Sequence, residues 1–495
     1  MKLRVIILFF ALILQVIGSP SIAVPETPPN IILILADDLG YGDLGIYGAD
    51  LIKTPHLDRL AGEGLRLTNF YASSNVCTPS RAGLLTGRYA IRDGLADKTI
   101  TLKDTRGLPA DTTTVAGLLR EQGYRTALIG KWHLGHHTPA QQPNAQGFDL
   151  FYGLLHPNDA AQSLYRNTQA TDEPFEQSAL TRRFTGEAVR FIENNSRQPF
   201  FLFMSHTAPH IPLVPSAAFA GTSRAGAYGD VVQELDWSVG QLLDAIQRNN
   251  LTDNTLIIFT SDNGPFPEGS TGGLRGGKGT AWDGGYRVPF IARWPGHIPA
   301  GGTTDAMAMN IDLLPTLAEV AGVPLPRFGQ LDGRNILPVL AGITDTSPHE
   351  VLYFFNNEHI AALRTQNWKM VVQASYRDIQ RRLPEHNVLL LFDMRSDPQE
   401  RYSMAAHRPD KWQELQAHLE SGRRELEALA MSRLRRQPDR LDSRLRGSGL
   451  AARRRPSMTA PDARSIGNDA VCCYMLRLYC PPVAKKASVN CPREQ

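Results

Sequence analysis

The sequence predicts an α/β protein in which helices flank a large, mostly parallel central sheet, followed by a smaller C-terminal antiparallel sheet plus a helix. Short apolar runs without alternation recur along the chain, which is typical of strands covered on both faces. Segments with helical periodicity lie between these runs, and such alternation favours a parallel sheet. The runs are 31–35, 126–129, 200–204 and 256–259, and the helical segments include 113–122 and 231–246.

The N-terminus has the layout of a secretory signal. Lys2 and Arg4 precede an apolar run over 5–17, and a small-x-small site ends at Ala23. The run is short for a membrane span, and no later run is long and apolar enough. We therefore expect residues 1–23 to be a signal peptide, the alternative being a retained anchor. The mature protein is expected to be exported, to the periplasm or the extracellular space, or to the lysosome if the source is eukaryotic.

The length and composition allow two domains with ample cores. The chain has 495 residues and a formal net charge of +3, which is unremarkable for this length and says nothing about partners. We expect no binding of nucleic acid. We predict an α/β domain over 24–340 and a smaller domain over 341–431, with a linker containing proline and glycine around 342–348. Within the smaller domain, strands are expected at 351–355, 361–364, 368–372 and 388–392, and an amphipathic helix at 411–429.

The C-terminal segment 432–495 shows no helical or strand periodicity and is predicted to be disordered. Its arginines suggest an alternative function, the salt-dependent binding of sulfated polyanions. They are Arg433, Arg435, Arg436, Arg440, Arg444, Arg446, Arg453, Arg454 and Arg455. Four cysteines follow whose pairing stays open: Cys472, Cys473, Cys480 and Cys491.

Acidic side chains follow two of the predicted strands. Asp37 and Asp38 come after the first run, and Asp262 and Asn263 come shortly after the run at 256–259. In an open α/β sheet, ligands bind at the carboxyl ends of strands. Carboxylate and amide oxygens together form a hard ligand set suited to Ca²⁺ or Mg²⁺. Each pair alone would more often cap a helix or lie in a loop, but together they predict a metal site.

Cys77 is the only cysteine between the leader and residue 471. Pro79 suits the first turn of a helix predicted over 80–86, so Cys77 would lie at the positive end of the helix dipole. Arg81 adds a planar fork of donors that matches tetrahedral oxyanions. Three interpretations stay open: an inert buried thiol, a reactive thiolate, and a chemically modified residue.

Further basic side chains follow the other strands. Lys131 and His133 lie two residues apart and are expected on one face of an extended segment. His206 and His210 follow the run at 200–204, and Lys278 lies in a glycine-rich stretch that brings its side chain close to a ligand. Each alone is more often structural, but as a set they indicate an anion-binding site.

These residues occur in motifs through which the chain resembles formylglycine-dependent sulfatases of the arylsulfatase A type, in the alkaline phosphatase-like superfamily. The resemblance runs from about residue 29 to about residue 430. Its most specific part is a Cys-x-Pro-x-Arg pentad followed by Leu-Thr-Gly-Arg. The motifs are Asp37-Asp38-Leu39-Gly40-Tyr41-Gly42-Asp43, Cys77-Thr78-Pro79-Ser80-Arg81, Gly130-Lys131-Trp132-His133-Leu134-Gly135, Ser261-Asp262-Asn263-Gly264 and Gly277-Lys278-Gly279-Thr280.

The resemblance implies a role for each of these positions. Cys77 would be oxidised by a formylglycine-generating maturation enzyme to formylglycine, whose hydrated aldehyde is a geminal diol. Asp37, Asp38, Asp262 and Asn263 would bind a divalent cation, Ca²⁺ or possibly Mg²⁺, that also contacts a diol oxygen at position 77. Arg81 and His133 would hold and activate the diol, Lys131 and Lys278 would neutralise sulfate oxygens, and His210, rather than His206, would protonate the leaving alcohol.

The implied activity is hydrolysis of a sulfate monoester, aryl or carbohydrate, to an alcohol and inorganic sulfate. Hydrolysis of a phosphonate or phosphate ester on the same scaffold is the alternative enzymatic function. The chain departs from the family in the loop after the Lys131-Trp132-His133 motif, where relatives often have a polar serine. Here the sequence is Leu155-His156-Pro157-Asn158-Asp159, so that contact is absent or is made by His156 or Asn158.

Overall fold

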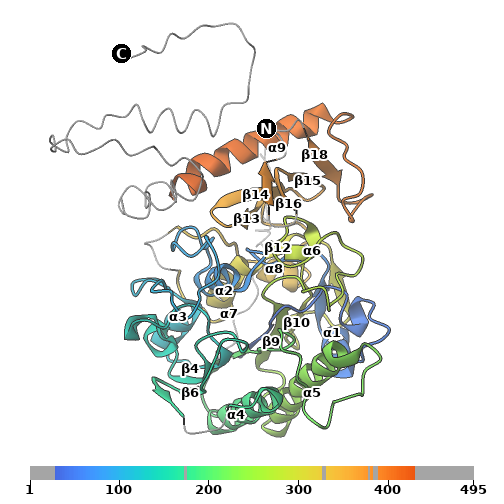
Figure 1. Ribbon diagram of the computed structural model, residues 1–495. Helices are drawn as coiled ribbons and strands as arrows, with labels where there is room; N and C mark the ends of the chain where they lie inside the picture. Colours follow the sequence, from blue (N-terminus) through green and yellow to red (C-terminus); the bar gives the residue numbers. More distant parts are fainter. Residues whose placement is uncertain (1–27, 172–174, 326–329, 377–378, 383–387, 430–495) are drawn as a thin grey trace, which may run out of the picture.

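The computed structural model describes residues 28–171, 175–325, 330–376, 379–382 and 388–429 (Figure 1). The predicted signal peptide, the C-terminal segment with its arginines and the four distal cysteines lie outside these residues. Among the residues that are described, no helix is both long enough and apolar enough to cross a membrane.

The centre of the molecule is a mixed sheet of ten strands in the order β11-β2-β10-β9-β1-β8-β4-β5-β6-β7. The strands β9, β1, β8, β4 and β5 pair in parallel, whereas β10 and β6 run antiparallel to their neighbours β9 and β5. The predicted large, mostly parallel sheet is therefore confirmed. Each of the four apolar runs found in the sequence lies within a parallel strand.

The bounds of the strands and helices before residue 341 are as follows. The strands are β1 (Asn30–Ala36), β2 (Leu65–Leu67), β3 (Phe70–Tyr71), β4 (Arg125–Lys131), β5 (Leu150–Leu154), β6 (Tyr165–Arg166), β7 (Gln169–Ala170), β8 (Phe200–Ser205), β9 (Thr255–Ser261), β10 (Phe290–Arg293), β11 (Gly302–Thr304) and β12 (Ala308–Met309). The helices are α1 (Pro55–Gly62), α2 (Cys77–Thr86), α3 (Val115–Glu121), α4 (Leu180–Asn194), α5 (Gly226–Arg248), α6 (Asp283–Tyr286), α7 (Leu313–Val320) and α8 (Leu337–Leu340). Short 3₁₀ turns lie at Gly45–Tyr47, Pro139–Gln141, Pro143–Gln146, Gln177–Ala179 and Asn310–Asp312.

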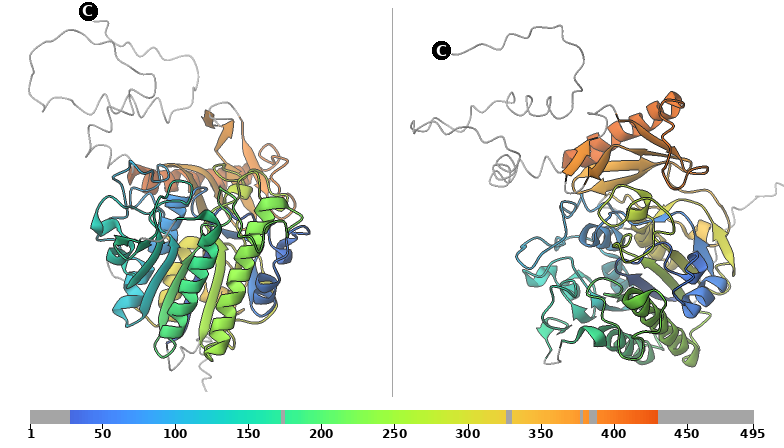
Figure 2. Two further views of the ribbon diagram at one scale, coloured as in Figure 1. Left: turned by 60° about the horizontal axis from the view of Figure 1, so that its bottom comes forward. Right: turned by 45° about the vertical axis from the view of Figure 1, so that its right-hand side comes forward.

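Helices cover both faces of the central sheet, which explains why its strands have no polar alternation. On β1, Ile32 and Ile34 pack into the core under α1, α4 and α5, whereas Leu33 and Leu35 pack into the core beneath α2, α3 and α7. The left view of Figure 2 shows α4 and α5 side by side across one face. With apolar layers on both faces, only the strand ends are free to carry polar chemistry.

The C-terminal part is a four-stranded antiparallel sheet covered by a long helix, as predicted. Its strand order is β13-β14-β15-β18, and the sheet and its helix lie on one end of the large domain (Figures 1 and 2). The bounds are β13 (Leu352–Asn356), β14 (His359–Arg364), β15 (Trp368–Val371), β18 (Leu390–Asp393) and α9 (Pro409–Gly422). A separate hairpin is formed by β16 (Gln373–Tyr376) and β17 (Ile379–Arg382).

The sequence-based boundaries differ from the structure most at three helices. The helix expected over 231–246 spans Gly226–Arg248, and the helix expected over 411–429 ends at Gly422 and continues as a π-helical turn over Arg423–Glu427. The helix expected over 80–86 begins three residues earlier, at Cys77. Pro79 occupies the third helical position, where a missing N–H costs nothing because the first-turn N–H groups have no intrahelical partner.

The N-terminus of α3 offers a test of the local energetics. The Thr114 hydroxyl accepts a hydrogen bond from the Gly117 N–H (3.0 Å) and donates one to the Gln146 carbonyl (2.7 Å), and the residue is buried. We expect Thr114→Ala to lower the free energy of unfolding by about 1–2 kcal/mol, measured by urea denaturation. The exposed neighbour Thr113 is the control, and Thr113→Ala should leave the urea midpoint unchanged. Equal urea midpoints for the two variants would contradict the capping role of Thr114.

Candidate active site

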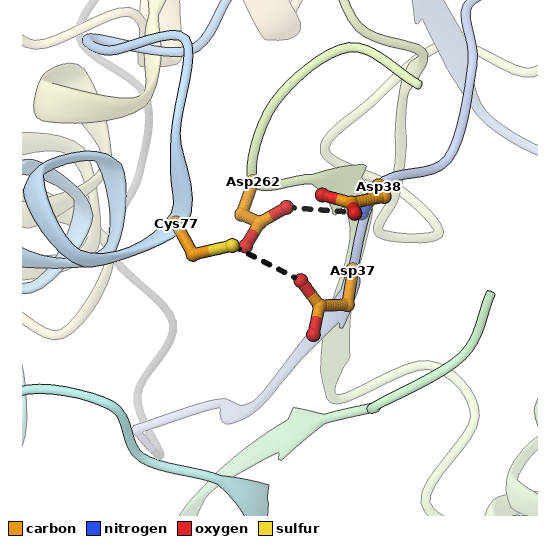
Figure 3. Close-up of side chains that lie close together, drawn as sticks. All are labelled: Asp37, Asp38, Cys77 and Asp262. Atoms are coloured by element: carbon orange, nitrogen blue, oxygen red, sulfur yellow. Dashed lines mark hydrogen bonds between the residues drawn. The ribbon is translucent and has the colours of Figure 1, made fainter. Parts of the chain in front are cut away.

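Neighbouring strand ends bring three carboxylates together. β1 and β9 pair in parallel with Ala36 opposite Ser261, so the residues that follow, Asp37 and Asp262, leave the sheet side by side. The Asp38 N–H donates to Asp262 Oδ1 (3.1 Å). One ligand atom from each of four buried residues, the three carboxylates and the Cys77 sulfur, lies within 4.8 Å of the others (Figure 3).

Asn263 completes this set of oxygen atoms. Its Nδ2 group donates to Asp38 Oδ1 (2.7 Å) and to the Gly264 carbonyl (2.9 Å). Its Oδ1 atom is buried and has no hydrogen-bond partner in the described part of the chain. A buried amide oxygen without a partner is costly unless something binds it. The residues therefore fit a hard divalent cation held by carboxylate oxygens and one amide oxygen.

The electrostatics of these carboxylates also fit a cation. Burial and the neighbouring Asp37 charge raise the pKa of Asp262 to about 6, against the opposing effect of Arg81. Burial would likewise raise the pKa of Asp37, but Lys131 and Arg81 hold it well below its usual value. A divalent ion would relieve the repulsion that remains among the carboxylates.

Cys77 is the first residue of α2, and its side chain points between Asp37 and Asp262 (Figure 3). Its sulfur lies 3.5 Å from Asp37 Oδ1 and 3.4 Å from Lys278 Nζ. Burial raises the pKa of the Cys77 thiol to about 12, although Lys131 and Lys278 lower it. The environment therefore disfavours the thiolate interpretation and leaves the inert and the modified residue.

Two buried cationic side chains, Lys131 and Arg81, pair with the carboxylates. Lys131, at the end of β4, donates to Asp37 Oδ2 (2.5 Å). The Arg81 guanidinium donates from Nε to Asp262 Oδ2 (2.9 Å) and lies 3.4 Å from Asp37 Oδ1. It also donates to Ser205 Oγ (2.7 Å). The fork of Arg81 is thus engaged by protein groups, whereas the sequence alone had suggested that it faces an oxyanion.

His133 does not continue the strand that carries Lys131, so the extended segment expected over these residues is wrong. β4 ends at Lys131, and His133 has a left-handed backbone with φ 59°. Its Nε2 contacts the Ile100 carbonyl (2.8 Å), and Nδ1 is buried without a partner in the described residues. Burial and the charge of Lys131 hold the pKa of His133 well below its usual value, so its ring is neutral. A strained backbone at such a residue is common in functional sites.

Lys278 and His210 lie on the more open side of the cluster. Lys278 Nζ donates to Asp38 Oδ2 (2.7 Å), and its ammonium lies 4.8 Å from the centre of the Phe266 ring. His210 Nε2 is 3.8 Å from Asp38 Oδ2, while its Nδ1 contacts the Ile211 carbonyl (2.6 Å). Both side chains therefore converge on Asp38 beside an exposed aromatic ring.

The other histidines named from the sequence have different surroundings. His206 is fully buried, with Nε2 3.5 Å from Ser238 Oγ on α5, and burial lowers its pKa to about 4. The His156 ring packs against His136 at 4.1 Å between centroids. Asn158 Nδ2 donates to Gln177 Oε1 (3.2 Å), whereas its Oδ1 is buried without a partner among the described residues.

Sequence reasoning missed two serines of the site. Ser205 accepts from Arg81 and donates to the Lys131 carbonyl (2.7 Å), and Ser80 Oγ donates to the Asp262 carbonyl. Ser205 is the last residue of β8, so the rule that strand ends carry the site would have found it. Ser80 lies inside the pentad motif but carries no chemistry that marks it on its own.

The arrangement is suited to binding a tetrahedral anion. Fixed positive charges, a helix N-terminus and a candidate cation site surround one buried position, residue 77. Such preorganised groups stabilise negative charge on an ester undergoing displacement.

Two family models match this chain. The model described as Sulfatase matches residues 29–323, and the model described as N-sulphoglucosamine sulphohydrolase, C-terminal, matches residues 277–429. The first covers the central sheet and every site residue named above, and the second covers the C-terminal sheet and α9.

Curated and solved relatives agree with these models. Human arylsulfatase A is 39% identical over 76% of this chain and 83% of its own length. Human steryl-sulfatase is 36% identical over 75% of this chain and 83% of its own length. The solved PsFucS1 sulfatase from Pseudoalteromonas sp. is 31% identical, with a TM-score of 0.73 over 80% of this chain and 90% of that one. The chain belongs to the sulfatase family, whose members are sulfuric ester hydrolases.

Proposed function

We propose that the protein hydrolyses a sulfate monoester, aryl or carbohydrate, to an alcohol and inorganic sulfate. The observation that carries this proposal is the position of Cys77. Its sulfur is buried within hydrogen-bond reach of Asp37 and Lys278, among carboxylates arranged for a cation. We further propose export of the mature protein and a maturation enzyme that converts Cys77 to formylglycine.

The two groups that complete the site have distinct chemistry. A hydrated aldehyde at position 77 would supply two hydroxyls on one carbon, one as a nucleophile toward sulfur and one that can lose a proton. A divalent cation, Ca²⁺ or possibly Mg²⁺, supplies Lewis acidity to the reacting oxygens and would be held by Asp37, Asp38, Asp262 and Asn263.

The protein's own side chains would stabilise charge, position the carboxylates and transfer protons. Lys278 and Lys131 place positive charge beside the sulfonyl oxygens, where negative charge spreads during displacement. Arg81 pairs with Asp37 and Asp262, and its charge favours the ionised form of each carboxylate. His133 is neutral, and its buried Nδ1 has no partner in the part of the chain that the structure describes, so it is available to accept a proton from the group at position 77.

His210 is proposed to donate a proton to the leaving alcohol. We expect His210→Ala to reduce kcat by about 10²–10³-fold for alkyl or sugar sulfates, which leave poorly without a proton. The loss should be much smaller for nitrophenyl sulfate, because a nitrophenolate leaves without protonation. Steady-state kinetics on both substrates check this, with His206→Ala as the control. An equal loss on both substrates would contradict the assignment.

The function is tested by measuring inorganic sulfate released from aryl, steroid and carbohydrate sulfates, with and without a chelator. The protein should be produced in a host that has the maturation enzyme. Matched aryl sulfate and aryl phosphonate substrates separate the two enzymatic alternatives. Faster turnover of the phosphonate would overturn the proposal, as would sulfate release that a chelator leaves unchanged under conditions that strip the metal.

A further inference from the structure

The side chain of Lys278 lies on a long segment that has no regular secondary structure of its own. This segment joins β9 to the short α6, and Lys278 is near its end. Locally, the Lys278 N–H bonds to the Pro265 carbonyl (2.9 Å) and the Gly279 N–H to the Asn75 carbonyl (3.0 Å). The Thr280 hydroxyl also donates to the Gly277 carbonyl (2.7 Å), and Asn75 Nδ2 donates to the Thr280 carbonyl (3.0 Å). These bonds join the loop to itself and to residue 75, so its position relative to the rest of the large domain depends on contacts at its two ends.

Glu400, in the loop after β18, contacts both ends of the stretch that carries Lys278. Its backbone carbonyl accepts from Arg275 Nη1 (2.8 Å), and its carboxylate Oε2 accepts from the Asp283 N–H (2.7 Å). The Gly284 N–H bonds to the Arg275 carbonyl (2.8 Å), so the two ends are also joined to each other. Lys278 lies at the middle of the loop that Glu400 closes.

Lys369, on the C-terminal strand β15, fixes Glu400 to the large domain. Its ammonium lies 2.8 Å from Glu400 Oε1 and 2.8 Å from Asp283 Oδ1, and all three side chains are 0% exposed. Asp283 is in turn bonded by the Tyr71 hydroxyl (3.1 Å), on the strand that precedes Cys77. The cluster therefore spans from the C-terminal sheet to both chain segments that meet at the active site.

Burying this cluster of charged side chains costs more free energy than a purely structural contact requires. Removing charged groups from water is costly, and apolar residues of the same volume often stabilise a buried site as well or better. Glu400 also has a left-handed backbone with φ 55°, which disfavours any residue with a Cβ. The strain is held by Asp397, whose Oδ2 accepts from the N–H groups of Arg401 and Tyr402 (both 2.8 Å). Buried charge and backbone strain together favour a role in fixing geometry.

We propose that Glu400 and Lys369 are positioning residues that hold Lys278 in the active site, so that the C-terminal sheet contributes to catalysis. The effect on turnover rests on the proposed function of Lys278, but the effect on the loop does not. A displacement of about 1 Å at a reacting centre costs on the order of 10²-fold in rate.

The test compares Glu400→Ala with Glu427→Ala. Glu427 is a matched control because it is also a buried carboxylate of the C-terminal part and accepts a backbone bond, from the Ile360 N–H (2.8 Å). We expect Glu400→Ala to speed amide hydrogen exchange over 275–285 at least severalfold, and Glu427→Ala to leave that stretch unchanged. Unchanged exchange over 275–285 in Glu400→Ala would overturn the proposal, even if the wild type releases no sulfate.

Kinetics add a second criterion. Glu400→Ala should lower kcat by about 10- to 100-fold, and Glu400→Gln should restore most of it because its amide oxygen accepts from Asp283. In a Lys278→Ala background, Glu400→Ala should cause little further loss. Equal losses in both backgrounds would show that Glu400 acts independently of Lys278 and would overturn the proposal.

A milder variant covers the case in which Glu400→Ala fails to fold. Arg275 is exposed, and its replacement by alanine removes its hydrogen bond to the Glu400 carbonyl without leaving an unpaired buried charge. Arg275→Ala should also speed exchange over 275–285 and lower kcat severalfold. Unaltered amide exchange and unaltered kcat in this folded variant would contradict the proposal that Glu400 holds the loop of Lys278.

Discussion

Cys77→Ser is expected to yield a protein that accepts one sulfuryl group and then stops. The serine hydroxyl can attack sulfur, so its oxygen forms the new S–O bond while the bond from sulfur to the alcohol breaks and the alcohol takes a proton. A serine has no second hydroxyl on the same carbon, so nothing can expel the sulfate. Multiple turnover should fall by roughly 10⁴-fold or more, the order of losing an essential nucleophile.

The measurement is alcohol release in the first seconds, followed by the mass of the peptide that contains residue 77. We expect at most one equivalent of alcohol and a sulfate ester on the serine. Cys77→Ala, which has no hydroxyl, should release none and carry no adduct. Undiminished multiple turnover by either variant would show that residue 77 is not the nucleophile.

Asp262→Asn is expected to abolish tight metal binding with little change in shape. Its carboxylate pairs with Arg81 and accepts from the Asp38 N–H, and it is one of the carboxylates whose mutual repulsion a cation would relieve. Removing its charge should weaken cation binding by about 100-fold or more, since even outer contacts contribute 10- to 100-fold. Activity at limiting metal should fall in proportion.

Metal binding has a readout that does not depend on activity. A cation at 100 times its Kd stabilises the folded protein by about 2.7 kcal/mol, so Ca²⁺ or Mg²⁺ should raise the Tm of the metal-stripped wild type. The shift should be lost in Asp262→Asn. Asp312→Asn is the control, because Asp312 is equally buried and accepts from the Met309 N–H (2.7 Å) without lying among the proposed ligands. An Asp262→Asn protein that keeps the full shift would exclude it as a ligand.

The strands and the clustering of acidic side chains at their ends were predictable because they depend on local pattern. An unbroken apolar run such as Ile31 to Leu35 is needed wherever both faces of a strand are covered, and polar residues are then confined to the strand ends. That confinement is why Asp37, Asp262 and Ser205 meet, although they are far apart in the sequence.

The remaining features depend on long-range geometry that no local pattern contains. The left-handed turn at His133 overrides the extended segment that its neighbours suggest. The link from Lys369 to Asp283 and Glu400 joins three segments through a register that only the folded sheet fixes. The sequence signal for this link was Lys369, a charged residue within a predicted buried strand, because such a charge requires partners.

The central claim is that residue 77 is an aldehyde in the working enzyme. Its most direct test is the mass of the peptide that spans Cys77 and Arg81, taken from protein whose sulfate release has been measured in the same preparation. The account predicts the mass of formylglycine in a fraction of molecules that scales with activity across preparations. Full activity from protein whose residue 77 is entirely unmodified cysteine would contradict it.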